Sequence, residues 1–291
     1  MLALGTLNQF TGNPSAGKTT LIHQAIAAHE RGKLFFVPTL HLPPGSVAYV
    51  STDRSRQVLE TQLRMVGSTQ CFLISTVDDR SFNAFDHSPE LMRQAVTERL
   101  KRSGLAFGTL VLDLAMDFMT GSAGNGKLLG HDGRLNVQWA EDLGVAILSL
   151  HYPFKQKSLN YALRQQDRTS GAVGIQASAS WKFNMIDKAE TRTHWILHAT
   201  PPPLGGPPQI AHMLRLNDPD GVGRFIPCRD PQIHSIEEFM ELNGCCRQTA
   251  AQYRNEDLKR WLEEADRLAD CSSPDWLEKA ELDPETVLTG N

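Results

Sequence analysis

A glycine-rich turn near the amino terminus constrains the fold of this chain more strongly than any other segment. Residues 12–19 read GNPSAGKT and match the pattern G-x-x-x-x-G-K-[ST] at every fixed position. An apolar run at residues 7–11 precedes the turn, and a segment with apolar residues at helical spacing follows it and ends near Gly32. The sequence therefore predicts a strand, a phosphate-binding loop and a helix in direct succession.

This loop has the residue types that hold a nucleoside triphosphate. Gly12 and Gly17 allow backbone N–H groups to curl around anionic oxygens, and the start of the following helix adds its partial positive charge. Lys18 would reach the β- and γ-phosphates, and the hydroxyl of Thr19 would contact Mg²⁺. The expected ligands are ATP and Mg²⁺; the alternative is an ordinary glycine-rich turn. The predicted nucleotide-binding residues are Gly12, Asn13, Pro14, Ser15, Ala16, Gly17, Lys18, Thr19 and Thr20.

Strand-like and helix-like segments alternate along residues 46–151. Continuous apolar runs separated by segments of helical periodicity are typical of a parallel sheet with helices on both faces, so the predicted fold class is α/β. In such sheets ligands gather at the carboxyl ends of the strands. The predicted strands are 46–53, 71–76, 108–115 and 145–151, and the predicted helices between them are 54–67, 88–104 and 135–144.

Polar residues at these strand ends are the candidates for hydrolysis. Asp113 closes one apolar strand, where a carboxylate can anchor Mg²⁺. Leu114 follows it where the AAA+ class would carry a Glu, and this argues against that class. Asp53 closes another strand and is the candidate general base for the attacking water, unless it only caps the next helix. His151 closes a third and either senses the γ-phosphate or is a structural histidine.

The order of these motifs resembles the RecA-type ATPase core over residues 1–228. The quoted elements are the phosphate loop, Asp53, VLD at 111–113, GVAILSLHYPFK at 144–155 and DRTSGAVGIQASASWKFNM at 167–185. They are most similar to the hexameric RepA helicase group of plasmids and phages, with DnaB-type helicases more distant. The resemblance implies a RecA-like P-loop NTPase core with a small helical C-terminal region, a Mg²⁺-dependent ATPase, single-stranded DNA as partner, and a homo-oligomer, either a hexameric ring or a filament.

Two basic segments are candidates for DNA contact. In the family the segment after His151 is mobile and often faces DNA, and Lys155, Lys157 and Arg164 lie there. A second predicted loop, residues 119–134, carries Lys127 and Arg134. A local cationic lining can hold a phosphate backbone although the net charge of the chain is −4; the alternative is a pair of solvated surface loops.

The chain departs from the family pattern at two points. Asp53 stands where the family usually has Glu, so the shorter carboxylate changes where a water could be held. A finger residue is a cation that one subunit contributes to the nucleotide of its neighbour. Here it would have to be Arg168 or Arg215, because the stretch between Arg192 and Arg215 contains no Lys or Arg.

A change of composition after residue 230 predicts a domain boundary there. Residues 1–230 are predicted to form the ATPase domain, and residues 231–291 a helical region with an acidic, frayed tail. Arg247, Arg254, Lys259 and Arg260 would suit a helix-turn-helix, but the acidic residues among them favour docking of a replication or single-strand-binding protein.

No apolar run approaches the roughly 18 residues of a membrane span, and no signal segment is evident. The expected location is the cytoplasm of a bacterium or of a phage-infected host. Three functions remain open from the sequence: a replicative helicase or translocase, a recombinase or strand-annealing ATPase, and an ATP-binding module that regulates or loads a replication protein.

Overall fold

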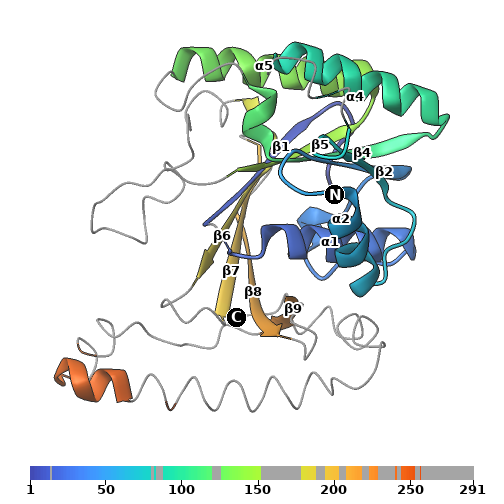
Figure 1. The fold of residues 1–291 in the computed structure, drawn as a ribbon. Coiled ribbons are helices and arrows are strands. Elements are labelled where there is room, and N and C mark those ends of the chain that lie inside the picture. The colour runs from blue at the N-terminus through green and yellow to red at the C-terminus, as the bar shows by residue number, and fades with distance from the viewer. Residues whose placement is uncertain are drawn as a thin grey trace. The chain divides into compact units, whose positions relative to one another are not determined.

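The computed structural model describes residues 1–13, 15–79, 82, 88–119, 126–151, 178–187, 194–202, 208–217, 223–228, 240, 244–252 and 256 (Figure 1). The chain divides into two compact units. One comprises Met1–Met185 with His198–Gln209, and the other comprises Ile186–Leu197 with Ile210–Asn291. The predicted division at residue 230 stays a prediction, because residues 229–239 lie outside the described part.

The first unit is built on a parallel sheet. Its strands follow the order β3-β2-β4-β5-β1-β6, so β5 separates β1 from β4, and all five neighbouring pairs are parallel. This confirms the predicted α/β fold class. The strands are β1 (Leu7–Gly12), β2 (Ser46–Ser51), β3 (Phe72–Ser75), β4 (Phe107–Asp113), β5 (Ala146–His151) and β6 (Lys182–Asp187).

Helices cover both faces of this sheet, with α1 and α2 on one side and α4 and α5 on the other (Figure 1). Leu7, Val50 and Leu110 of the strands pack in one buried cluster with Val96 of α4 and Trp139 of α5. This burial on two faces is why the strands read as continuous apolar runs. The helices are α1 (Lys18–Glu30), α2 (Arg56–Met65), α4 (Pro89–Ser103) and α5 (Gly126–Leu143), and the 3₁₀ turns are η1 (Pro38–Leu40) and η2 (Ala115–Phe118).

The predicted loop at residues 119–134 is wrong in its second half, because α5 begins at Gly126. Lys127 and Arg134 therefore belong to a helix, and Arg134 is exposed on it. Gly130, Gly133 and Ala140 are buried on α5. Small residues at these spacings let the helix pack closely, and this tertiary packing outweighs the low helix propensity of glycine that suggested a loop.

The second unit contains the antiparallel strands β8 (Gln209–Asn217) and β9 (Gly223–Cys228), in which Leu214 lies opposite Ile226. Strand β7 (His194–Thr200) belongs partly to each unit. Residues 247–252 are helical, and Gly244, at φ +58°, lies in a turn just before them. In the described part of the chain, no helix is long and apolar enough to cross a bilayer.

Candidate nucleotide site

The loop between β1 and α1 forms a concave backbone turn. Ala16 N donates to Asn13 O over 3.1 Å, and Ser15 and Gly17 have positive φ angles of 62° and 88°. A Cβ atom on Gly12 would lie 3.1 Å from Met185 Cβ of β6, so a larger residue would crowd this strand end. Pro14 lies outside the described residues. Among the described residues no side chain caps the start of α1 and no acid lies in its first turn, which leaves N–H groups for an anion.

Lys18 lies folded back into this turn. Its Nζ donates to Gly12 O over 2.7 Å and to Asn13 O over 3.1 Å, and the residue is only 6% exposed. Burial lowers the pKa of Lys18 to about 8; the Asp113 carboxylate acts against this shift, and the Arg54 guanidinium adds to it. The ammonium is thus held where phosphate oxygens would relieve the cost of its burial.

Raising the pH should weaken nucleotide binding and stabilise the nucleotide-free protein over the same interval. Between the folded pKa of about 8 and the usual 10.5, unfolded protein keeps a proton on Lys18 that folded protein has lost, so folding stability rises with pH. Phosphate affinity falls there because the neutral amine attracts no anion. Melting curves and titrations with a fluorescent ATP analogue would measure both. If Lys18→Met shows the same two pH dependences, Lys18 is not their source.

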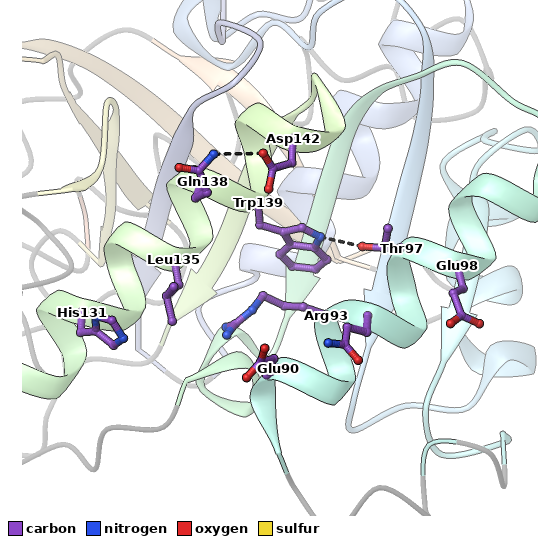
Figure 2. Close-up of a pocket in the computed structure, with 10 residues that line it drawn as sticks. Glu90, Arg93, Thr97, Glu98, His131, Leu135, Gln138, Trp139 and Asp142 are labelled. Carbon is purple, nitrogen blue, oxygen red and sulfur yellow. Dashed lines mark hydrogen bonds between the residues drawn. The ribbon is translucent and has the colours of Figure 1, made fainter.

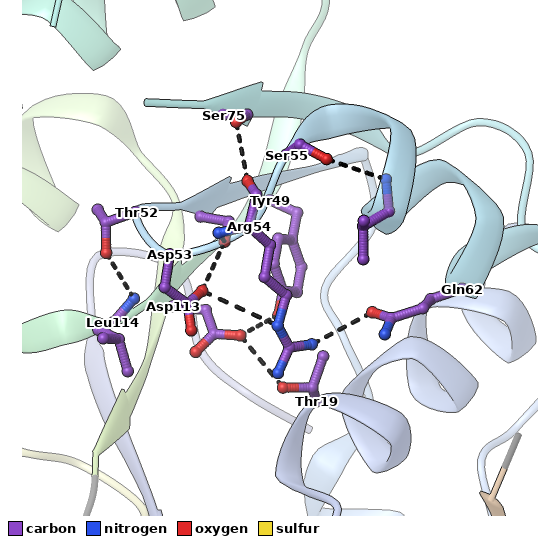
Figure 3. Close-up of polar contacts among 12 residues, drawn as sticks. Thr19, Tyr49, Thr52, Asp53, Arg54, Ser55, Gln62, Ser75, Asp113 and Leu114 are labelled. Carbon is purple, nitrogen blue, oxygen red and sulfur yellow. Dashed lines mark hydrogen bonds and ion pairs between the residues drawn. The ribbon is translucent and has the colours of Figure 1, made fainter. Parts of the chain in front are cut away.

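The metal-ligating pair predicted from the sequence is brought together at this loop. Thr19 Oγ1 donates to Asp113 Oδ2 over 3.2 Å, and Tyr49 OH donates to the same oxygen over 2.6 Å (Figure 3). Asp113 is 3% exposed, and this burial raises the pKa of its carboxyl group, which the Tyr49 hydrogen bond and the Arg54 charge partly offset. A cation beside a buried carboxylate would be stabilised by it.

These residues fit Mg²⁺. Mg²⁺ is usually bound through one or two carboxylates together with substrate phosphates and water, and the Thr hydroxyl of a phosphate loop also contacts it. Thr19 and Asp113 supply that donor set, and the described residues hold no cluster of three or more His, Cys, Asp or Glu that would make an all-protein metal site.

Asp53 lies just after β2, on the same edge of the sheet as Asp113. Its Oδ1 accepts a hydrogen bond from Ser51 Oγ over 3.0 Å, and its side chain is 35% exposed. The alternative that Asp53 caps the next helix is wrong, because Ser55 is the N-cap of α2 and its side chain accepts from Val58 N. Asp53 is therefore available to solvent and to a ligand.

His151 ends β5 and is fully buried. Its Nε2 lies 3.1 Å from Ser149 Oγ, while Nδ1 has no hydrogen-bond partner among the described residues. Burial, with a smaller effect of Lys18, lowers the pKa of His151 to about 4, so the ring is neutral at pH 7. The pairing of β5 with β1 places His151 opposite Thr11, the residue before Gly12 of the phosphate loop.

The predicted DNA-binding and finger residues either lie outside the described part of the chain or belong to other elements. Arg168 lies outside the described residues, as do Lys155, Lys157 and Arg164. Lys127 and Arg134 lie in α5, and Arg215 lies in β8 of the second unit, opposite Phe225.

Sequence reasoning missed Tyr49 and Arg54. Tyr49 is fully buried in the middle of β2, where its side chain reads as one more core residue, and its ring packs edge-on against His23 with centroids 5.1 Å apart. Arg54 reads as the first charged residue of an exposed turn. Its position directly after Asp53 was the one available signal.

A pocket of about 540 Å³ lies apart from this site, between α4 and α5 (Figure 2). Inside it, Arg93 donates to Phe118 O over 2.9 Å, and Trp139 Nε1 donates to Thr97 Oγ1 over 2.9 Å. These bonds join the two helices and η2. The pocket is lined by Glu90, Arg93, Gln94, Thr97, Glu98, His131, Leu135, Gln138, Trp139 and Asp142.

Replacing Arg93 by methionine should lower the free energy of unfolding by about 1–3 kcal/mol. The variant would remove the buried hydrogen bonds that Arg93 NH1 donates to Phe118 O over 2.9 Å and to Asn136 Oδ1 over 3.4 Å. Urea unfolding would measure the change. Arg102→Met is the matched control, because Arg102 forms an exposed pair with Glu98 on the same helix and should cost about 0.5 kcal/mol or less. Equal effects of the two variants would contradict the structural role of Arg93.

The family of the chain follows from comparison with known families. A model described as an AAA domain matches residues 1–157. The chain belongs to the AAA domain family. The matched segment of the AAA domain contains Lys18, Thr19, Asp53, Asp113 and His151, and it supports a P-loop ATPase that binds nucleotide. No curated protein matches the chain.

Within the matched AAA domain, Leu114 and not Glu follows Asp113. In this AAA domain, Leu114 N instead donates to Thr52 Oγ1 over 3.1 Å, which ties the end of β4 to the residue before Asp53.

Proposed function

We propose that the chain is a Mg²⁺-dependent ATPase that acts on single-stranded DNA as a ring-forming helicase or translocase of RepA type. The observation that carries the ATPase mechanism is the 3.2 Å contact between Thr19 and Asp113 beside the buried Lys18. The DNA part is supported by the resemblance of residues 144–185 to the RepA group.

In this mechanism the loop holds the substrate and the strand ends act on it. Lys18 and the N–H groups of the loop and of the first turn of α1 bind the β- and γ-phosphates of ATP, and Thr19 and Asp113 would hold magnesium. When bound, the metal neutralises charge on the phosphate oxygens. Catalysis of this kind depends on positioning and electrostatics more than on covalent chemistry.

Asp53 is the general base. It orients a water molecule and takes its proton while the water oxygen bonds to the γ-phosphorus and the bond to the ADP oxygen breaks. The partly exposed carboxylate has the solvent access that a water-activating group needs, and Ser51 fixes its position.

His151 is the link to the DNA-binding segment. The neutral ring lies opposite Thr11, one residue before the phosphate loop, and this supports a role in sensing the γ-phosphate. The segment that follows His151 in the sequence carries Lys155, Lys157 and Arg164, which bind the phosphates of the DNA backbone.

The assembly is a hexameric ring or a filament, in which Arg168 or Arg215 of one copy would reach the nucleotide of the next. Residues 231–291 dock a replication or single-strand-binding protein. Native mass spectrometry with and without ATP would test the assembly.

The function is tested by measuring ATP hydrolysis with and without single-stranded DNA, followed by strand displacement on forked DNA. DNA-stimulated hydrolysis with directional unwinding is expected. Nucleotide-controlled filament assembly without unwinding would instead identify a recombinase or annealing ATPase. Tight binding of a replication protein without DNA stimulation would identify a loader. Absence of saturable ATP binding by the folded chain would overturn all three.

A further inference from the structure

We propose that Arg54 is a catalytic residue of the nucleotide site in its own chain: on ATP binding its guanidinium leaves Asp53 and Gln62 for the γ-phosphate. This inference rests on the proposed ATPase function and adds a cis-acting cation to it. It also couples two events, since the same movement releases Asp53 to act as the base.

The geometry around Arg54 places its charge at the mouth of the loop. Its NH1 donates to Gln62 Oε1 of α2 over 3.2 Å, and its Nε lies 3.9 Å from Asp53 Oδ1. Figure 3 shows the guanidinium beside Thr19 and Asp113, with one nitrogen joined to Gln62. The Arg54 charge accordingly lowers the pKa of both Lys18 and Asp113, for which burial causes the larger shift in each case.

The present partners of Arg54 are weak for a guanidinium. Arginine carries five N–H donors arranged to bind two oxygens of one anion side by side. In the described part of the chain its side chain makes one hydrogen bond, to a neutral amide, and one ion pair at the long distance of 3.9 Å. Neither is the bidentate pair that arginine favours, so a phosphate with several oxygens would be the better partner.

In the described part of the chain, the Asp113 carboxylate bonds to other residues and not to the Arg54 guanidinium. Its Oδ2 accepts hydrogen bonds from Thr19 and Tyr49. Two cations, Lys18 and Arg54, therefore act on the same small region around Asp113. Since the Arg54 side chain is 29% exposed, a ligand entering from solvent can reach it.

Movement of Arg54 would free the Asp53 carboxylate from its 3.9 Å ion pair with the guanidinium, so Asp53 Oδ1 can turn to a water molecule. The guanidinium also stabilises the negative charge on the γ-phosphoryl oxygens as the bond to ADP breaks. Arginines in this role raise kcat by about 10³–10⁵-fold.

A purely structural role for Arg54 makes a different prediction. The turn between β2 and α2 is held by backbone contacts, including Arg54 N donating to Ser51 Oγ over 3.2 Å and the Ser55 cap of α2. Those contacts do not use the guanidinium. A structural role would therefore change stability and would affect ATP and ADP alike.

The test compares Arg54→Gln and Arg54→Lys with Arg56→Gln in the full chain. Arg56 is the control because it pairs with Glu60 on the exposed face of α2. Each variant is titrated with fluorescent analogues of ATP and of ADP in the presence of magnesium, and kcat and KM for ATP are measured. Melting curves establish that each variant is folded.

For Arg54→Gln we expect ADP affinity within about twofold of the wild type, ATP affinity lower by about tenfold, and kcat lower by about 10³-fold or more. Arg54→Lys keeps the charge and the stem but not the planar fork, so it should restore little of kcat. Arg56→Gln should leave every quantity unchanged.

Two results would overturn the inference while leaving the proposed ATPase intact. One is an unchanged kcat in folded Arg54→Gln or Arg54→Lys, and the other is an equal loss of ATP and ADP affinity. If Arg54→Gln fails to fold, Arg54→Lys decides alone, and wild-type kcat in that variant counts against the inference. Wild-type protein that binds no ATP would overturn the proposed function, and this inference with it.

Discussion

Lys18→Met is expected to lower kcat/KM for ATP by about 10³-fold or more, which corresponds to about 4 kcal/mol of transition-state stabilisation. The variant keeps the buried aliphatic stem and removes the ammonium that now bonds to Gly12 O and Asn13 O. Without that charge, the loop loses its main attraction for the β- and γ-phosphates. ATPase assays and titration with a fluorescent ATP analogue would measure the loss.

Lys101→Met is the matched control for this prediction. Lys101 is exposed in the last turn of α4 and should be replaceable without effect on nucleotide affinity. If Lys18→Met and Lys101→Met bind ATP equally well, the turn at residues 12–19 does not bind phosphate, and the mechanism built on it is wrong.

Asp53→Asn should lower kcat by about 10²–10⁴-fold while leaving ATP affinity the same or slightly higher. The amide keeps the shape of the side chain and can still accept a hydrogen bond from Ser51, but it cannot take a proton from water. Affinity does not fall, because a negative charge near the phosphates has been removed. Single-turnover hydrolysis together with equilibrium binding separates the two effects.

Asp142→Asn serves as the control, since Asp142 is exposed on α5 and accepts a hydrogen bond from Gln138 over 3.0 Å, which an asparagine can also accept. It should hydrolyse ATP at the wild-type rate. Activity of Asp53→Asn equal to that of Asp142→Asn would remove Asp53 from the role of base and would leave the attacking water to be activated elsewhere.

Part of the candidate site could be predicted from short sequence patterns. Lys18 and Thr19 follow Gly12 at fixed short spacing, and the backbone that curls around a phosphate is local, so the motif could predict its own structure. Asp113 was predicted because a carboxylate that ends an apolar strand faces the ligand edge of a parallel sheet. Each of these inferences requires only the neighbouring residues and the fold class. None requires knowledge of contacts between residues far apart in the sequence.

Other parts of the site could not be predicted in this way. Tyr49 reaches Asp113 across a separation of 64 residues, and only the pairing of β2 with β4 brings them together. The direction of the Arg54 side chain depends on Gln62, which in turn depends on where α2 packs. A tyrosine in an apolar strand and an arginine in a turn carry no sign in the sequence of which neighbour they will meet.

The features of the fold that the sequence could not predict also depend on contacts between distant residues. The sequence determined the alternation of strands and helices, the phosphate loop and the polar strand ends, because these follow from local conformational preference and from the periodicity of apolar residues. Only the tertiary structure decided that β5 lies between β1 and β4, that glycine-containing α5 starts at Gly126, and that His151 is buried and neutral. Those outcomes depend on the free energy of packing between residues far apart in the chain, which no short stretch of sequence contains.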